Sequence, residues 1–407
     1  MTKRILINIG GHFALGPRPQ KEAAAAVKAG FEVFVRGNWW DTQLAKEDLE
    51  IAKKLGVEFK PLLDLRHRNM RTRLTKLKHR ASATIASCLG TTSARSFGNA
   101  GPEMVKETVR MAPDLVMLHS EAGLWAGKKL IKAGYRVGID FEDWFSEDLP
   151  MSDRKSRPTD ALKELETLLV RKADPQFATT QCMADALREL AGTSIAPIAI
   201  PNAFPWASRP ATNPINNLGE TVRFYWFSQT IGPHRGLEHL ATALKEIEGS
   251  WELHLLGNLR NYQEWFNETF GMLGDRVTIH SPVTNQELPV KTATFDIGLA
   301  LETPYCRNKD VTASNKIFEY LRCGLPVIAT DTRGQCEVMS KCPDAGWLVP
   351  SNDVERLRSL IQKIVDRPAV LSDARNASLH AAEHVWAWEL FEPKLIEGLL
   401  RGVETKR

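Results

Sequence analysis

Short apolar runs alternate with amphipathic segments along almost the whole chain of 407 residues. The runs are RILINI, FEVFV, VEFKPLL, DLVMLH, YRVGID, PQFATT and APIAI in the first half, then VRFYWFS, WELHLLG, RVTIHS, FDIGLAL, LPVIAT and GWLVP. Continuous apolar runs of this length are typical of parallel strands that are buried on both faces. The segments between them, such as PQKEAAAAVKAG and GLEHLATALKEI, have helical composition. The pattern therefore predicts βα units in doubly wound α/β sheets.

The alternation is interrupted once, between Pro201 and Glu220. This stretch, PNAFPWASRPATNPINNLGE, is rich in proline and asparagine and has neither a strand nor a helix period, so it reads as a linker. Each side of it is long enough for one Rossmann-sized domain. We therefore expect one domain at 1–205, a second at 206–385, and a C-terminal helix at 386–407 whose position allows it to pack back on the first domain.

Composition and charge narrow the class of protein further. The net charge of +4 is too small to indicate a nucleic-acid partner, and no apolar run reaches the ~18 residues of a membrane span. The first residues resemble a strand rather than a signal peptide. The six cysteines form no C-x-x-C pair and no zinc spacing, which favours free thiols in a reducing compartment. These observations predict a cytoplasmic protein.

The segment 66–80, RHRNMRTRLTKLKHR, has seven Lys or Arg residues and no acid. Met70, Leu74 and Leu77 give it a thin apolar stripe at helical spacing. Two interpretations stay open. The segment is either a solvated surface helix, or a basic amphipathic element that contacts anionic lipid headgroups or a phosphorylated acceptor. The lipid version would place the protein at the periphery of the inner membrane.

The stretch SNKIFEYLRCGLPV predicts a short helix that Ser314 or Thr312 caps and Gly324 ends. On this helix, Asn315, Lys316 and Glu319 share the arc opposite the apolar residues. A lysine in a first turn is unfavourable unless an anion binds there, and a carboxylate one turn later can accept hydrogen bonds from ribose hydroxyls. The alternative is an i,i+3 Lys–Glu pair on the surface, which stabilises little.

Two loops that follow expected strands add candidate ligand contacts. In FSQTIGPHRGLEHL, Arg235 lies between a strand and a helix start, where it can contact an anion through two hydrogen bonds. In GGHFALGPRP, Gly10 and Gly11 let a ligand approach the backbone closely. Neither loop contains G-x-G-x-x-G or a Walker sequence, which argues against a nicotinamide dehydrogenase and a P-loop enzyme.

Together these segments resemble the retaining, family 4-like glycosyltransferases of GT-B fold (glycosyl transferases group 1). The most specific part is the donor motif in SNKIFEYLRCGLPV. Family-like pieces precede it in the expected order: GPRPQKEAAAAVKAGFEVFV, PDLVMLHSEAG, VGIDFEDWFSED, AIPNAF, FSQTIGPHRGLEHL and FDIGLAL. The resemblance covers roughly residues 3–350.

The resemblance implies two facing Rossmann-like domains with a cleft between them, the first for an acceptor and the second for a nucleotide-sugar donor. It also implies roles for individual residues. Glu319 would hold the ribose, while Arg235 and Lys316 would neutralise the leaving diphosphate without a metal. The donor would be contacted further by Asn315, Gly10 and Gly11, and His119 would hydrogen-bond its sugar.

The sequence departs from the family at several positions. Many members have two glutamates separated by seven residues, but Val311 stands where the first is expected. Glu302 or Asp310 would replace it, and of the two we prefer Glu302 as a catalytic residue beside His119, Arg235 and Lys316. Arg235 and Gly236 stand where Lys-Gly is usual, and Glu142 replaces the histidine of the family's D-x-H-E stretch.

The expected activity is transfer of a hexosyl unit, with retention, from a UDP- or GDP-sugar to a glycan or lipid-linked acceptor. No cofactor or metal is expected. Two alternatives remain open, namely a GT-B epimerase or donor hydrolase, and a non-catalytic sugar-nucleotide-binding module.

Overall fold

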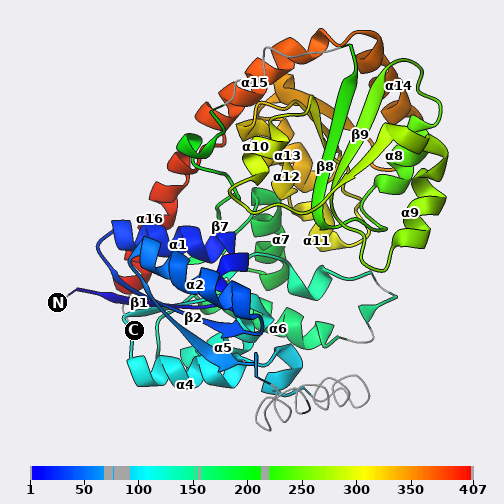
Figure 1. Ribbon diagram of the computed structural model, residues 1–407. Helices are drawn as coiled ribbons and strands as arrows, with labels where there is room; N and C mark the ends of the chain where they lie inside the picture. The colour runs from blue at the N-terminus through cyan, green and yellow to red at the C-terminus, as the bar shows by residue number, and fades with distance from the viewer. Residues whose placement is uncertain are drawn as a thin grey trace. The chain divides into compact units, whose positions relative to one another are not determined.

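The computed structural model describes residues 2–67, 77, 92–150, 152–154, 157–211 and 220–404. The chain forms two compact units (Figure 1). Unit 1 comprises Met1–Pro201 and Phe391–Arg407, and unit 2 comprises Asn202–Leu390. The division thus falls at 201/202 where the sequence placed it at 205/206, and the returning C-terminal segment starts at 391 rather than 386. Most of 66–80, of the linker after 211, and Cys88 lie outside the described residues.

Unit 1 is built on a seven-stranded parallel sheet with strand order β3-β2-β1-β4-β5-β6-β7. Its strands are β1 (Arg4–Asn8), β2 (Glu32–Trp39), β3 (Glu58–Asp64), β4 (Leu115–Leu118), β5 (Val137–Phe141), β6 (Gln176–Ala178) and β7 (Ile198–Ala199). Its helices are α1 (Pro17–Lys28), α2 (Thr42–Leu55), α4 (Gly101–Met111), α5 (Ser120–Lys132), α6 (Thr159–Lys172), α7 (Gln181–Ala191) and α16 (Glu392–Glu404). In register, Ile7 of β1 pairs with Val35 on one side and Met117 on the other.

Unit 2 is built on a six-stranded parallel sheet with strand order β10-β9-β8-β11-β12-β13. Its strands are β8 (Val222–Thr230), β9 (Trp251–Asn258), β10 (Val277–His280), β11 (Ile297–Ala300), β12 (Val327–Thr330) and β13 (Gly346–Val349). Its helices are α8 (Leu237–Leu244), α9 (Gln263–Phe270), α10 (Leu288–Thr292), α11 (Arg307–Val311), α12 (Asn315–Arg322), α13 (Arg333–Met339), α14 (Val354–Asp366) and α15 (Val370–His384).

The strands coincide with the apolar runs of the sequence, so the α/β prediction is confirmed. The central strands are buried on both faces: every residue of β4, β5, β11 and β12 is buried. Their side chains form the core with those of the flanking helices, for example Leu240 and Ile361 in unit 2. This burial explains why the runs show no polar alternation.

Both sheets reverse their strand order at the same relative place. In unit 1, β1 lies between β2 and β4, and in unit 2, β8 lies between β9 and β11. The helices that follow the two central strands therefore leave in opposite directions and open a crevice at the carboxyl ends of the strands, where ligands bind in doubly wound sheets. A ligand site is therefore expected at the loops after β1 and β4 in unit 1, and at those after β8 and β11 in unit 2.

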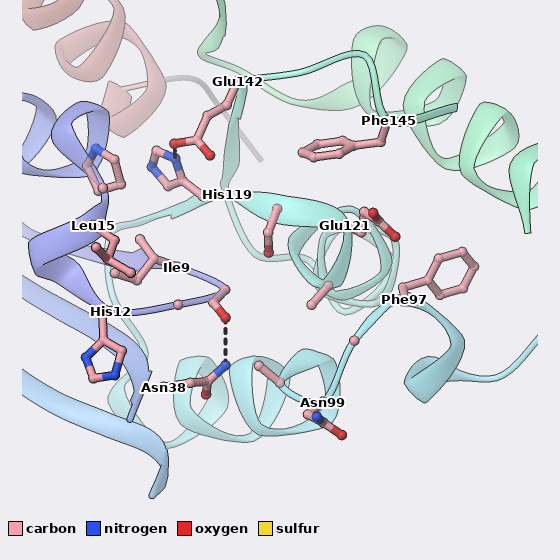
Figure 2. Close-up of a pocket in the computed structure, with 18 of the residues that line it drawn as sticks. Ile9, His12, Leu15, Asn38, Phe97, Asn99, His119, Glu121, Glu142 and Phe145 are labelled. Atoms are coloured by element: carbon pink, nitrogen blue, oxygen red, sulfur yellow. Dashed lines mark hydrogen bonds and ion pairs between the residues drawn. The ribbon is translucent and has the colours of Figure 1, made fainter. Parts of the chain in front are cut away.

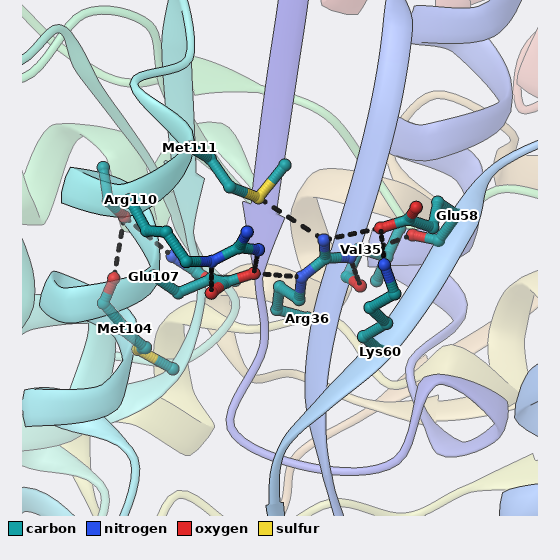
Figure 3. Close-up of polar contacts among 10 residues, drawn as sticks. Val35, Arg36, Glu58, Lys60, Met104, Glu107, Arg110 and Met111 are labelled. Carbon is teal, nitrogen blue, oxygen red and sulfur yellow. Dashed lines mark hydrogen bonds and ion pairs between the residues drawn. The ribbon is translucent and has the colours of Figure 1, made fainter.

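A buried arginine holds the edge of the unit 1 sheet together (Figure 3). Arg36 of β2 is only 1% exposed, and it forms ion pairs with Glu58 of β3 and Glu107 of α4, both at 2.7 Å. Hydrogen bonds from Arg110 and Arg36 outweigh burial and lower the pKa of Glu107 to about 2. The cluster links β2 to β3 and α4. Strand β2 also carries Asn38, which lines a cavity in unit 1.

The C-terminal helix α16 packs within unit 1. A Cβ atom at Gly398 would lie 2.8 Å from Cζ of Phe177 in β6, so this crossing needs glycine. Lys28 of α1 also pairs with Glu392. None of the helices in the described part of the chain combines the length and apolar character needed to cross a membrane.

Candidate functional site

The crevice of unit 1 contains a cavity of about 500 Å³ at the carboxyl ends of β1 and β4 (Figure 2). Its wall includes Gly10 and Gly11 from the loop after β1, and His119 at the end of β4. Three residues that the sequence analysis selected separately therefore line one cavity.

Side chains from other loops approach both glycines closely. A Cβ atom at Gly10 would lie 2.5 Å from Oγ of Ser120, and one at Gly11 would lie 3.0 Å from Cη2 of Trp40. The first separation is too short for any real contact, so a larger residue at Gly10 would have to displace Ser120. Both glycines line the cavity, and neither brings a side chain into it.

His119 is buried between two carboxylates from different elements. Its Nε2 lies 2.8 Å from Oε2 of Glu22 in α1, and its Nδ1 lies 3.1 Å from Oε1 of Glu142 after β5. Figure 2 shows Glu142 directed at the imidazole ring. A neutral imidazole has only one N–H, so it cannot donate to two ionised carboxylates. The geometry therefore favours the imidazolium.

The pKa shifts in this group follow from the same contacts. Burial opposes a charge on His119, but the attraction of Glu22 and Glu142 outweighs it and raises the pKa of His119 well above the usual range. Burial raises the pKa of Glu22, although His119 partly offsets the effect. For Glu142, the contacts with His119 outweigh burial and lower the pKa.

A second ion pair closes the base of this network. The Nε and Nη2 atoms of Arg18 donate to the carboxylate of Asp140 at 2.8–3.1 Å, and Nη1 donates to the carbonyl of Ile200. Ligand atoms of Glu22, His119 and Asp140 lie within 4.8 Å of one another, close enough to hold a metal ion. The guanidinium of Arg18 already supplies a cation to Asp140, so we assign no metal to this group.

The crevice of unit 2 begins with the loop after β8. Nη1 of Arg235 donates to Oγ of Ser228 at 3.1 Å, which directs the guanidinium along the end of its own strand. Gly236 has φ +72°, and a Cβ there would lie 2.0 Å from the carbonyl oxygen of Leu301 after β11. The glycine thus lets the β8 and β11 loops meet.

Lys316 lies in the first turn of α12, and its cation is partnered within the chain. Nζ of Lys316 donates to Oε1 of Glu302 at 2.8 Å, and Oγ of Ser314 donates to the same oxygen at 3.0 Å. Nζ also lies 5.4 Å from the ring centroid of Trp226. Burial alone would raise the pKa of Glu302, but Lys316 and Lys309 outweigh it and lower the pKa to about 2.

Lys309 and Tyr305 belong to this cluster and were missed by the sequence analysis. Burial raises the pKa of Tyr305, and the charges of Lys309 and Arg235 oppose that shift. Lys309 and Lys316 therefore act on the carboxylate of Glu302, and Lys309 and Arg235 act on Tyr305. The only sequence signal for Lys309 was its place in CRNKD, shortly before the donor motif.

Glu319 has a different environment from the one expected. It is 1% exposed, its Oε2 accepts from Nη2 of Arg322 at 2.6 Å, and Sγ of Cys323 contacts its other oxygen. Burial raises the pKa of Glu319, and Arg322 counteracts this. The helix therefore has no open polar arc that Lys316 and Glu319 share, and the alternative Lys316–Glu319 surface pair is also not formed, because each side chain pairs elsewhere.

The remaining candidates in unit 2, Asn315 and Asp310, have different hydrogen-bonding partners. Oδ1 of Asn315 accepts from Asn202 at 2.7 Å, on the exposed side of the α12 N-terminus. Asp310 accepts two hydrogen bonds from Arg333, from its backbone N–H and its Nε. Of the two candidates for the missing glutamate, the structure thus places Glu302 beside Lys316 and Asp310 beside α13. The catalytic and binding roles of all these residues stay predictions.

Residues 222–367 match the family model described as Glycosyl transferases group 1. The matched stretch lies within unit 2, which is therefore similar to a glycosyl transferases group 1 domain. The match spans the whole cluster of Arg235, Glu302, Lys309 and Lys316 together with Glu319. No protein in a search of curated sequences matches the chain.

Solved structures extend the similarity over both units. Sucrose-phosphate synthase from Thermosynechococcus elongatus superposes with a TM-score of 0.72 at 16% identity, covering 98% of each chain. HepE of Anabaena, solved with UDP and glucose, gives 0.70 at 15% identity and covers 98% of this chain and 99% of its own. A putative UDP-N-acetylglucosamine 2-epimerase from Listeria monocytogenes gives 0.59 at 15%, covering 100% and 98%. At these identities the likeness establishes the GT-B fold.

Proposed function

We propose that the protein is a retaining glycosyltransferase that moves a hexosyl unit from a nucleotide diphosphate sugar to a glycan or glycolipid acceptor. The observation that carries the proposal is the cluster at the switch point of unit 2. Lys316 and Lys309 act on the carboxylate of Glu302, and Arg235 and Lys309 act on Tyr305. All of these residues lie within the stretch that matches the glycosyl transferases group 1 model. A diphosphate is the ligand that such an excess of cations suits.

These cations would act on the leaving group. Negative charge develops on the diphosphate as the bond to the sugar breaks, and fixed cations nearby stabilise the transition state more than the ground state. Lys316 is held in place by Glu302, so its ammonium needs little rearrangement when the donor binds. The diphosphate would also help to deprotonate the acceptor on the same face of the sugar, which gives retention without a strong base.

The proposed function also indicates which nucleotide the donor carries and where the protein acts. HepE was solved with UDP, which supports a uridine nucleotide, and GDP remains the second candidate. Gly10, Gly11 and His119 in the unit 1 cavity would contact the donor, His119 through its sugar. No metal is required in this scheme. The place of action would be the cytoplasm, with 66–80 as the segment that would contact an anionic inner-membrane surface.

A direct assay tests the proposal. The purified chain is incubated with UDP- and GDP-hexoses and a panel of glycan and glycolipid acceptors. Proton NMR of the product then gives its anomeric configuration. We expect a glycoside with the anomeric configuration of the donor sugar, formed only when acceptor is present. An inverted product would contradict retention, and no product with any donor would contradict the enzyme assignment.

The second candidate is a sugar-nucleotide epimerase or hydrolase, which the structural likeness to the Listeria protein favours. Either activity would consume donor without acceptor. The same assay without acceptor separates them: an epimerised nucleotide sugar indicates an epimerase, and free hexose with nucleoside diphosphate indicates a hydrolase. Tight binding of a nucleoside diphosphate without any turnover would instead identify a non-catalytic binding module.

A further inference from the structure

We infer that the unit 1 cavity selects an uncharged, hydroxyl-rich acceptor, the neutral end of a glycan, through Ser120, Asn38, Asn99 and Trp40. This inference rests on the proposed transferase function and names its acceptor class. It differs from the interpretation of 66–80 as a contact for a phosphorylated acceptor. Unpartnered oxygen atoms, an aromatic surface and the charge of the cavity wall all favour such a ligand.

Ser120 is the first indication of ligand binding. It is the first residue of α5 and has φ +69°, a left-handed conformation that is unfavourable for any residue with a Cβ. Its Oγ is buried and has no hydrogen-bonding partner within the described residues, although it borders Gly10 in the cavity wall. Strain combined with an unsatisfied hydroxyl in a cavity indicates a functional contact, because neither feature contributes to folding stability.

Two asparagines with unpartnered oxygen atoms line the same cavity. Nδ2 of Asn38 donates to the carbonyl of Gly10 at 2.9 Å, a bond that only the amide nitrogen can make (Figure 2). The orientation of Asn38 is therefore settled, and its buried Oδ1 has no partner in the described part of the chain. The Oδ1 of Asn99 is likewise buried and unpartnered there. Carbonyl oxygens of this kind accept hydrogen bonds from sugar hydroxyls.

Trp40 supplies an apolar surface beside these oxygens. It is 48% exposed, and its ring meets that of His12 edge-on at 4.4 Å between centroids. Nε2 of His12 accepts from the backbone N–H groups of Trp40 and Asp41, and Nδ1 lies 2.8 Å from Asp48. These bonds fix the aromatic pair. An exposed, anchored tryptophan suits the apolar face of a pyranose, whose edge would then reach the polar atoms.

The charge of the wall favours a neutral ligand. Among the described residues that line the cavity there is no lysine or arginine, whereas Glu121 and Glu142 are both present. Glu121 pairs with Arg157, and the imidazolium of His119 is already balanced by Glu22 and Glu142. Against the described residues of this wall, a phosphate or carboxylate on the acceptor would lose its water without gaining a lysine or arginine partner, which is unfavourable. The unit 2 crevice has the opposite balance.

The test compares neutral sugars with sugar phosphates by saturation-transfer NMR and calorimetry, in the presence of UDP. The neutral probes are maltose, cellobiose, lactose and methyl hexosides, and the anionic probes are glucose 6-phosphate and mannose 6-phosphate. We expect binding of at least one neutral probe and weaker or no binding of its phosphate. Ser120→Ala and Asn99→Ala should each weaken neutral binding about 2- to 10-fold, the range for one net hydrogen bond. The matched controls Ser340→Ala and Asn267→Ala replace exposed residues of unit 2 and should have no effect.

The variant Ser120→Gly tests whether weaker sugar binding comes from misfolding or from loss of the hydroxyl. Glycine accepts φ +69° without strain, so this variant should be at least as stable as the parent and yet bind neutral sugar as weakly as Ser120→Ala. Preferred binding of the sugar phosphates, no binding of any neutral probe, or unchanged binding in all cavity variants would each overturn the inference. UDP binding separates the two proposals. If UDP binds and transfer occurs but only to an anionic acceptor, the neutral-acceptor inference fails and the transferase function stands.

Discussion

The two switch points have the same topology and opposite chemistry. In unit 1, the loops after β1 and β4 bring glycines, hydroxyl and amide oxygens, and one histidine between two carboxylates. In unit 2, the segments after β8 and β11 bring Lys309 and Lys316 to Glu302, and Arg235 to Ser228 and Tyr305. The strand order produces a crevice in both cases. Loop residues alone determine that one crevice suits a neutral polyol and the other an anion.

The two crevices differ in how their charged side chains are paired. In unit 2, Glu302 orients Lys316, and Arg235 contacts the neutral hydroxyl of Ser228, so an incoming anion would add a negative charge beside these cations. In unit 1, every charge at the base of the cavity already has a partner, including Arg18 with Asp140. Removing these partners should therefore affect stability and UDP binding differently in the two units.

The largest effect is expected for Lys316→Ala. It leaves the buried carboxylate of Glu302 without its ammonium partner, and breaking such a pair typically costs about 3 kcal/mol of stability. It should also weaken UDP binding about tenfold, since a charge-assisted hydrogen bond contributes roughly 1.5–3 kcal/mol. Urea unfolding and calorimetry measure the two effects. The double variant Lys316→Met/Glu302→Gln should recover stability without recovering UDP binding; joint recovery would show that Lys316 does not contact the anion.

Glu319→Gln should lower stability by about 1–3 kcal/mol, because the guanidinium of Arg322 loses a buried charged acceptor. If Glu319 also holds the ribose, activity per folded molecule should drop well beyond this loss. Thermal unfolding and the activity of the folded fraction separate the two roles. Normal activity in the folded fraction would leave Glu319 with only its pairing to Arg322.

Glu22→Gln should change the pH dependence of stability. The pKa values of His119 and Glu22 are both raised in the folded protein, so their stabilising contribution is complete below the unfolded values and is lost as pH rises through the folded ones. Stability of the parent should therefore decline above about pH 6.5, the unfolded value for histidine. The decline should be shallower in Glu22→Gln, by about 1.4 kcal/mol for each unit by which the pKa of His119 falls.

Chemical unfolding between pH 6 and pH 10 measures this difference, with Glu50→Gln as the control because Glu50 is exposed on α2. Comparing the two variants removes contributions from other groups, such as Glu166, whose pKa burial raises to about 7. Identical slopes in parent and Glu22→Gln would mean that Glu22 does not hold His119 in its charged form.

The smallest effect is expected for Asp310→Asn. Its partner Arg333 is more than half exposed, and ion pairs of this kind contribute about 0–1 kcal/mol. Neither UDP binding nor turnover should change, in contrast to Glu302→Gln, which should reduce both. Calorimetry and the transfer assay on the two variants check this. A larger kinetic loss in Asp310→Asn than in Glu302→Gln would assign the missing glutamate's role to Asp310 instead.

Local patterns predicted the strands and the α12 helix because those features depend on neighbouring residues. The continuous apolar runs and the left-handed Gly324 at φ +69° are examples. The pairings at the sites depend on contacts far apart in sequence, such as His119 with Glu22, 97 positions away, and could not be inferred. The pairing of Glu319 with Arg322 was within reach, since the two residues are one helical turn apart.

The central claim is that the unit 2 crevice binds the diphosphate of a nucleotide sugar through Arg235. Calorimetric titration of UDP and GDP into the parent, Arg235→Ala and Arg356→Ala tests it most directly, because Arg356 is an exposed arginine on α14 of the same unit. The account predicts that the parent binds at least one of the two nucleotides, that Arg235→Ala weakens binding about tenfold or more, and that Arg356→Ala leaves it unchanged. No binding by the parent, or equal binding by Arg235→Ala, would contradict it.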